Sequence, residues 1–87
     1  MLDTVKDALR IKMNIFDSDI KRLIAAAELD LSLSGIKKIE ESNALIQQAV
    51  ILYCKAHFER KPDEDIERIL KAYESLKITI SLCGDYI

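Results

Sequence analysis

Cys54 and His57 come nearest, among the residues of this 87-residue chain, to a chemical site. Three positions apart, they share one face if the segment is helical. A thiol beside an imidazole suggests either a nucleophile pair or half of a zinc site. His57 is the only histidine and Cys83 the only other cysteine, so neither a triad nor a four-ligand site can be completed from them. We therefore expect a buried thiol beside a partly buried imidazole, with no metal, no cofactor and no catalytic residue.

The acidic runs at residues 40–41 and 63–65 are the other candidates for chemistry. Paired carboxylates act in catalysis when they oppose one another across a cleft. Here the first run lies in a connector, and the second stands where a helix N-terminus favours negative charge. The only glycines are Gly35 and Gly84, so the chain has no glycine-rich phosphate loop. We expect solvated charge at both acidic runs and no enzymatic activity.

Two helices are predicted in the first half of the chain. Apolar residues at helical spacing begin at Leu2 and continue to a segment end near Ile11 or Lys12. A second stripe, from Ile20 to Leu31, is strongly amphipathic. Asp17 or Ser18 is placed to cap this second helix. Its end is expected at residues 34–35, because glycine readily adopts the left-handed conformation that terminates helices.

The third predicted helix covers residues 45–58 and is apolar on nearly all sides. Such a helix is buried in the middle of a fold. Ser42 or Asn43 is placed to cap it. In the preceding connector, residues 36–42, Ile36 and Ile39 are expected to be buried while the charged residues face water.

The fourth predicted helix starts after the turn at residues 60–63 and continues to about Ile80. Residues 77–82 also alternate with period two, so a short strand is the alternative for the end. We favour helix, because no break signal precedes Gly84. Tyr73 falls at a core-like position. The predicted fold is therefore all-α, a small four-helix domain with a buried third helix and a short C-terminal tail.

Composition restricts the class of protein further. One modest core is expected for 87 residues, so residues 1–87 are assigned to a single domain. The net charge of −2 is evenly spread, with seven basic and eight acidic residues in positions 1–43, and this disfavours tight nonspecific DNA binding. No stretch approaches the roughly 20 apolar residues of a membrane span, and we expect no membrane partner. Two cysteines without CxxC spacing are typical of a reducing compartment.

The sequence resembles the small head–tail connector proteins of long-tailed bacteriophages and prophages, also described as DNA-packaging proteins. The resemblance extends in order over residues 2–11, 17–27, 45–53 with 55–58, 72–77 and 82–86. These segments belong to the fold and contain no active-site motif. The resemblance therefore concerns architecture and a role in assembly.

That resemblance implies a homo-oligomeric ring, about twelve copies in the virion, that lies beneath the portal protein. The ring would join the portal to a tail-completion or stopper protein and surround the channel through which DNA passes without sequence-specific binding. Near-neutral charge suits such a conduit, because a basic lining would hold the phosphates of the passing DNA. The implied location is the head–tail interface of the virion, with the host cytoplasm as the place of assembly.

The residues expected to bind a partner lie at the C-terminal end, where apolar side chains are predicted to be exposed: Ile78, Leu82, Tyr86 and Ile87. The alternative function is a small helical DNA-binding or regulatory protein. A helix–turn–helix needs a recognition helix with outward polar side chains. The third predicted helix offers few of these, and the connector after Gly35 is long for that motif.

Overall fold

The computed structural model describes residues 1–37, 39–40, 43–58 and 63–82, of which residue 63 only by its backbone. They form four helices: α1 (Leu2–Leu9), α2 (Asp17–Leu33), α3 (Ala44–Phe58) and α4 (Asp63–Ser81). There is no strand among the described residues. The all-α prediction is confirmed, and the C-terminal segment up to Ser81 is helical where a strand was the alternative.

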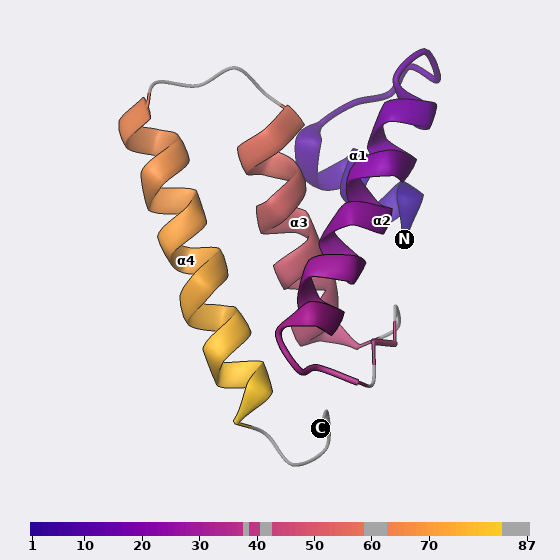
Figure 1. Ribbon diagram of the computed structural model, residues 1–87. Coiled ribbons are helices and arrows are strands. Elements are labelled where there is room, and N and C mark those ends of the chain that lie inside the picture. Colours follow the sequence, from indigo (N-terminus) through magenta and orange to yellow (C-terminus); the bar gives the residue numbers. More distant parts are fainter. Residues whose placement is uncertain (38, 41–42, 59–62, 83–87) are drawn as a thin grey trace.

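Helix α3 lies at the centre of the molecule and contacts each of the other three helices. In Figure 1, α2 and α4 flank α3 on opposite sides, and α1 packs beside α2 and α3. The side chains of Ile46, Val50 and Cys54 are fully buried. A helix that is apolar on nearly all sides can be stable only when neighbours cover it, and here three neighbours do.

The core is completed by residues from the other helices and from the connector after α2. Fully or almost fully buried are Val5, Leu9, Ile20, Ile24, Ala27, Leu31, Ile36, Tyr73 and Ile80. Tyr73 and Ile80 come from α4, so this helix is held by two positions seven residues apart. The predicted burial of Ile36 is confirmed, and Ile39 packs at the edge of the core.

Helices α1 and α2 end with the same hydrogen-bond pattern. Gly35 has a φ of 95°, its N–H donates to the Ser32 carbonyl, and the N–H of Ile36 donates to the Leu31 carbonyl. This Schellman pattern confirms the predicted end of α2. Arg10 repeats it with a φ of 59°. Helix α1 therefore ends at Leu9, two or three residues before the predicted end, because Arg10 takes the left-handed conformation that usually falls to glycine.

The predicted capping residue of α2 is wrong, whereas that of α3 is right. Phe16 occupies the N-cap position of α2, and no side chain caps that end. Its ring packs edge-on against Phe58, with the centroids 5.5 Å apart, so a core contact fixes where the helix begins. At α3, the side chain of Asn43 accepts hydrogen bonds from the N–H groups of Leu45 (2.9 Å) and Ile46 (3.4 Å).

A buried lysine joins α1 to the start of α2. The Lys6 ammonium donates to Oδ1 of Asn14 at 2.9 Å and pairs with Oδ1 of Asp17 at 2.8 Å. Asp17 also stands in the first turn of α2, where the helix dipole favours an anion. The residue expected to cap α2 therefore serves as the acidic partner of a lysine on a neighbouring helix.

Candidate functional site

The C-terminal end of α4 presents two of the four residues predicted to bind a partner. Ile78 and Leu82 are 58% and 79% exposed and lie one helical turn apart on one face. Helix α4 has no basic residue in its last turn. Tyr86 and Ile87, the other two residues of the predicted surface, lie outside the described residues. The structure thus places two of the four residues together on an exposed apolar stripe.

Cys54 and His57 do not form a chemical pair. The thiol of Cys54 is fully buried, and burial raises its pKa to about 11. A thiol in such surroundings is protonated near neutral pH and is a poor nucleophile. His57 is exposed and packs against the ring of Tyr53, with centroids 4.3 Å apart. The buried thiol is confirmed, but the imidazole is more exposed than the sequence suggested, because α3 ends at Phe58.

The acidic runs show no arrangement for chemistry among the residues that are described. Glu40 and Glu64 are exposed, and Asp65 is half-buried. Across the described part of the chain, no group of three His, Cys, Asp or Glu side chains is placed to hold a metal ion. None of the helices, as far as they are described, is long and apolar enough to cross a bilayer.

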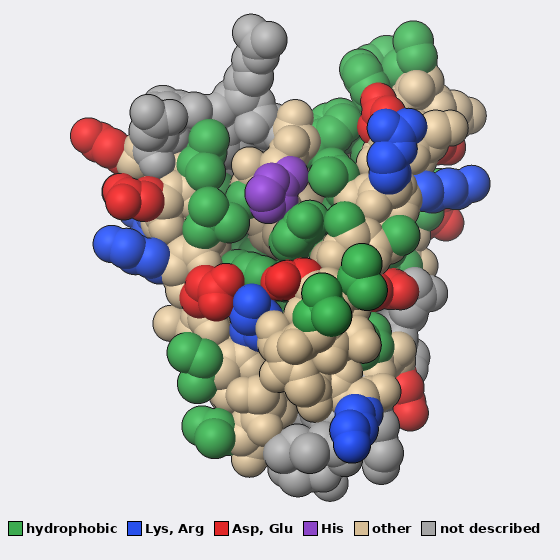
Figure 2. Space-filling model, viewed as in Figure 1, with side chains coloured by type: hydrophobic (Ala, Val, Ile, Leu, Met, Phe, Trp, Pro, Cys, Tyr) green, Lys and Arg blue, Asp and Glu red, His purple; other side chains and the backbone are tan. Residues whose placement is uncertain are grey.

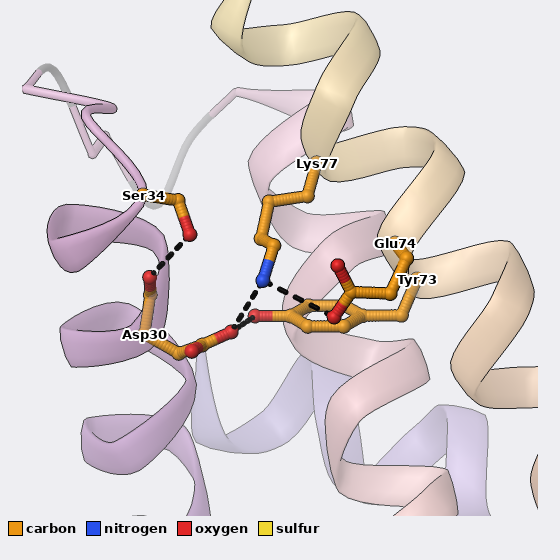
Figure 3. Close-up of polar contacts among 5 residues, drawn as sticks. All are labelled: Asp30, Ser34, Tyr73, Glu74 and Lys77. Atoms are coloured by element: carbon orange, nitrogen blue, oxygen red, sulfur yellow. Dashed lines mark hydrogen bonds and ion pairs between the residues drawn. The ribbon is translucent and has the colours of Figure 1, made fainter.

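A polar cluster that the sequence did not predict joins α2 to α4. The hydroxyl of Tyr73 donates to Oδ2 of Asp30 at 2.6 Å, and the ammonium of Lys77 approaches the same oxygen at 3.1 Å (Figure 3). Lys77 also pairs with Glu74 at 3.2 Å, and its nitrogen lies 5.2 Å from the centre of the Tyr73 ring. Asp30 is more than 40 positions along the chain from Tyr73 and from Lys77, so no local pattern could have revealed the contact between α2 and α4.

The protonation of this cluster follows from its contacts. The Tyr73 hydroxyl and then Lys77 hold the pKa of Asp30 below its ordinary value, against the opposing effect of partial burial. Burial and the neighbouring Asp30 carboxylate raise the pKa of Tyr73. Burial alone would lower the pKa of Lys77, but its hydrogen bonds to Asp30 and Glu74 outweigh burial and raise it. The cluster is therefore a neutral phenol and an ammonium around carboxylates, an arrangement that fastens two helices and offers no free base.

An open pocket of about 500 Å³ lies between the first half of α2 and the end of α3. Its lining is mixed, with apolar and charged side chains: Phe16, Asp19, Arg22, Leu23, His57 and Phe58. In Figure 2 the histidine, coloured purple, sits in a hollow of the visible face with hydrophobic side chains around it. Such a pocket suits an apolar group from another molecule.

Further large apolar side chains are exposed outside the pocket. They are Met13 and Ile15 before α2, Leu29 and Leu33 on α2, and Leu45 at the start of α3. Single exposed apolar residues are ordinary, but pairs one turn apart on two helices make apolar stripes that suit contacts with other proteins. The exposed features thus favour docking surfaces over a reaction centre.

The arrangement of α3 argues against a helix–turn–helix reader of DNA. A recognition helix must present one face to the major groove. Helix α3 is instead covered by α1, α2 and α4, and its half-buried or buried residues continue along most of its length.

The fold and these surfaces together define a class: a small all-α domain whose exposed features are apolar stripes, an open pocket and structural polar contacts. The family model described as "Phage connector protein" matches residues 1–86. The chain therefore belongs to the phage connector protein family, and the resemblance read from the sequence is confirmed. No curated protein and no solved structure matches the chain significantly.

Proposed function

We propose that the chain is a structural virion protein that forms a ring adaptor beneath the portal. In this role, about twelve copies join the DNA-filled head to a tail-completion or stopper protein and surround the DNA exit channel. The observation that carries the proposal is the family match over residues 1–86, nearly the whole chain. Membership in a connector family indicates a structural connecting role, and the ring, the portal and the tail-side partner are the finer parts of the proposal.

The chemistry of this role is binding alone, with no catalysis, metal or cofactor. Supporting it, Ile78 and Leu82 form an exposed apolar stripe. The sequence beyond it has two further apolar residues, Tyr86 and Ile87, which lie outside the described residues. We propose that these residues dock on a partner in the assembled virion. Because Ile78 and Leu82 are largely exposed, their burial on docking would remove substantial apolar surface from water.

The charge of the chain suits a conduit for DNA. With a net charge of −2 and no basic half, the protein does not supply the dense positive surface that would retain phosphates. The proposed relation to DNA is passage without sequence-specific binding. The proposed location is the head–tail interface of the virion, after assembly in the host cytoplasm.

The first experiment measures the mass of the purified protein by light scattering over a range of concentrations, with and without a portal oligomer from the same phage. Expected are rings of the protein alone, or monomers that join the portal in about a dozen copies. A 9.9 kDa species that ignores the portal at high concentration would contradict the adaptor role. The small DNA-binding or regulatory protein would then be the better hypothesis, to be examined by gel shift at low salt.

A further inference from the structure

The pocket and the C-terminal end of α4 complement one another, and they lie at opposite ends of the molecule. The pocket is next to His57 and Phe58, where α3 ends. The apolar stripe of Ile78 and Leu82 belongs to the C-terminal end of α4. Figure 1 shows that end of the helix on the side of the molecule opposite to the end of α3. A contact between these two surfaces rests on the proposed assembly of the chain with copies of itself.

The pocket has an apolar interior, and its lining also carries the oppositely charged side chains of Arg22 and Asp19. Phe16, Leu23 and Phe58 supply the apolar lining. The guanidinium of Arg22 stands at the rim with its side chain 77% exposed, and its only described ion pair, with Asp19, is long at 3.4 Å. Such a loose surface pair leaves much of the guanidinium's hydrogen-bonding capacity for a partner.

The end of α4 offers the matching features. Its apolar stripe carries two aliphatic side chains one turn apart, and the Leu82 N–H donates a hydrogen bond to the Ile78 carbonyl at 3.1 Å. The C-terminus of a helix bears partial negative charge. Helix α4 has no basic residue in its last turn to offset that charge, and Lys77 directs its ammonium to Asp30 and Glu74.

These two surfaces cannot meet within one chain. Helix α4 has 19 residues, so at 1.5 Å per residue its ends are about 28 Å apart. The buried side chains of Tyr73 and Ile80 hold the second half of α4 against the rest of the molecule. The pocket therefore lies about one helix length from the stripe of the same chain.

We propose that the C-terminal end of α4 of one copy docks in the pocket between α2 and α3 of the next copy. Ile78 and Leu82 enter among the apolar side chains of the pocket, and Arg22 faces the negative end of the helix. Because the two surfaces differ, the contact is heterologous: each copy keeps a free pocket at one side and a free α4 end at the other. A contact of this kind closes into a ring when the rotation between copies allows it.

The test compares Leu82→Lys with Leu33→Lys in light scattering and sedimentation, alone and on the portal oligomer. The two variants are matched, because both leucines are 79% exposed and each stands at the C-terminal end of a helix that has no basic residue in its last turn. A lysine there suits the helix dipole, so helical content is expected to persist in both variants. We expect Leu82→Lys to weaken association between copies at least tenfold and Leu33→Lys to change it less than twofold.

A second arm uses Arg22→Glu, which reverses the charge at the rim of the pocket. This variant alone is expected to lose association at least tenfold, because a carboxylate would face the negative end of α4. Mixing it with Leu82→Lys should restore association, since the intact pocket of one variant meets the intact α4 end of the other. Failure of the mixture to form even dimers, with both variants helical, would overturn the proposed contact.

The outcomes separate this contact from the function on which it rests. A wild-type chain that assembles, together with a Leu82→Lys variant that assembles equally well, would overturn the contact and leave the ring adaptor standing. A wild-type chain that stays monomeric both alone and with the portal would overturn the adaptor role, and the contact with it. Loss of association in Leu82→Lys and in Arg22→Glu, but not in Leu33→Lys, supports both.

Discussion

Tyr73 combines a buried ring with a hydroxyl bound to a charged group. The residue is only 2% exposed, and its hydroxyl lies 2.6 Å from the Asp30 carboxylate. We predict that Tyr73→Phe lowers the free energy of unfolding by about 1–2 kcal/mol, because the ring stays packed while a charge-assisted hydrogen bond is lost. Tyr73→Ala should cost about 3–5 kcal/mol, since it also removes the ring. Urea unfolding measures both, and a Tyr73→Phe variant as stable as the wild type would contradict the role given to the hydroxyl.

Asp30 makes the stability of the fold depend on acid. Its pKa is lower in the folded protein than its ordinary value of 3.8, so its contacts stabilise the fold above about pH 4 and lose that effect as the pH falls through the lower folded value. We predict that Asp30→Asn is less stable than the wild type at neutral pH. Between about pH 5 and pH 2, the range that brackets the titration of a free carboxyl group at about pH 4, this variant should lose less stability than the wild type.

Denaturant midpoints along that pH series measure the effect. Asp19→Asn is the matched control, because Asp19 pairs with Arg22 in an exposed, 3.4 Å contact that contributes little. Parallel acid curves for the wild type and Asp30→Asn would show that Asp30 has no special part in the acid response.

Cys54 is expected to be inert in the folded protein. Its side chain is fully buried and its pKa is raised to about 11, so the reactive thiolate is scarce and shielded. In a Cys83→Ser background, we predict slow labelling of Cys54 by a maleimide at neutral pH and rapid labelling in denaturant. Labelling of the native protein as fast as that of the unfolded chain would revive the idea of a cysteine nucleophile.

At the scale of the helices, the chain terminates α1 and α2 by the same backbone pattern with different residues. Gly35 adopts a positive φ without steric cost, whereas the side chain of Arg10 makes the left-handed backbone conformation strained. The hydrogen bonds of Arg10 and Ile11 to the last turn of α1 hold the strained residue in place. The end of α1 is therefore a position where the local sequence and the fold disagree.

This disagreement predicts a stabilising substitution. Arg10→Gly should raise the free energy of unfolding by about 0.5–1 kcal/mol, because it relieves the strain at an exposed position. Gly35→Ala should lower it by about 1 kcal/mol, even though a Cβ there would meet no atom within 4 Å. Thermal unfolding measures both. A destabilised Arg10→Gly would mean that the arginine side chain contributes more than the strain costs.

At the scale of the whole molecule, the proposed adaptor uses its C-terminal tail to hold the portal. We predict that deletion of residues 84–87, which removes Tyr86 and Ile87, weakens portal binding while the helical content persists, because α4 and its core contacts at Tyr73 and Ile80 remain. Circular dichroism reports the helices, and co-sedimentation with the portal oligomer reports binding. Unchanged portal binding would exclude the tail from this contact. Self-association, assigned above to Ile78 and Leu82, should be little affected.

The amino-acid sequence by itself determined the helices and the buried place of α3. Those features follow from hydrophobic spacing, which is written into neighbouring residues, and an all-round apolar segment has no stable place except the interior. The C-terminal end of α2 and the start of α3 were also predictable. Gly35 terminates α2 and Asn43 caps α3 through backbone contacts that span only a few residues. The family was recognisable for the same reason: its signature is a run of such local segments in order.

Only the tertiary structure decided how the side chains meet. The bond between Tyr73 and Asp30 joins residues 43 positions apart, and both ends depend on how α2 and α4 lie against α3. The pocket likewise combines the start of α2 with the end of α3. Local pattern also failed at Phe16 and Arg10, where packing and backbone hydrogen bonds between turns outweighed residue preference. The physical reason is that long-range packing energies exceed the small local preferences that a sequence pattern expresses.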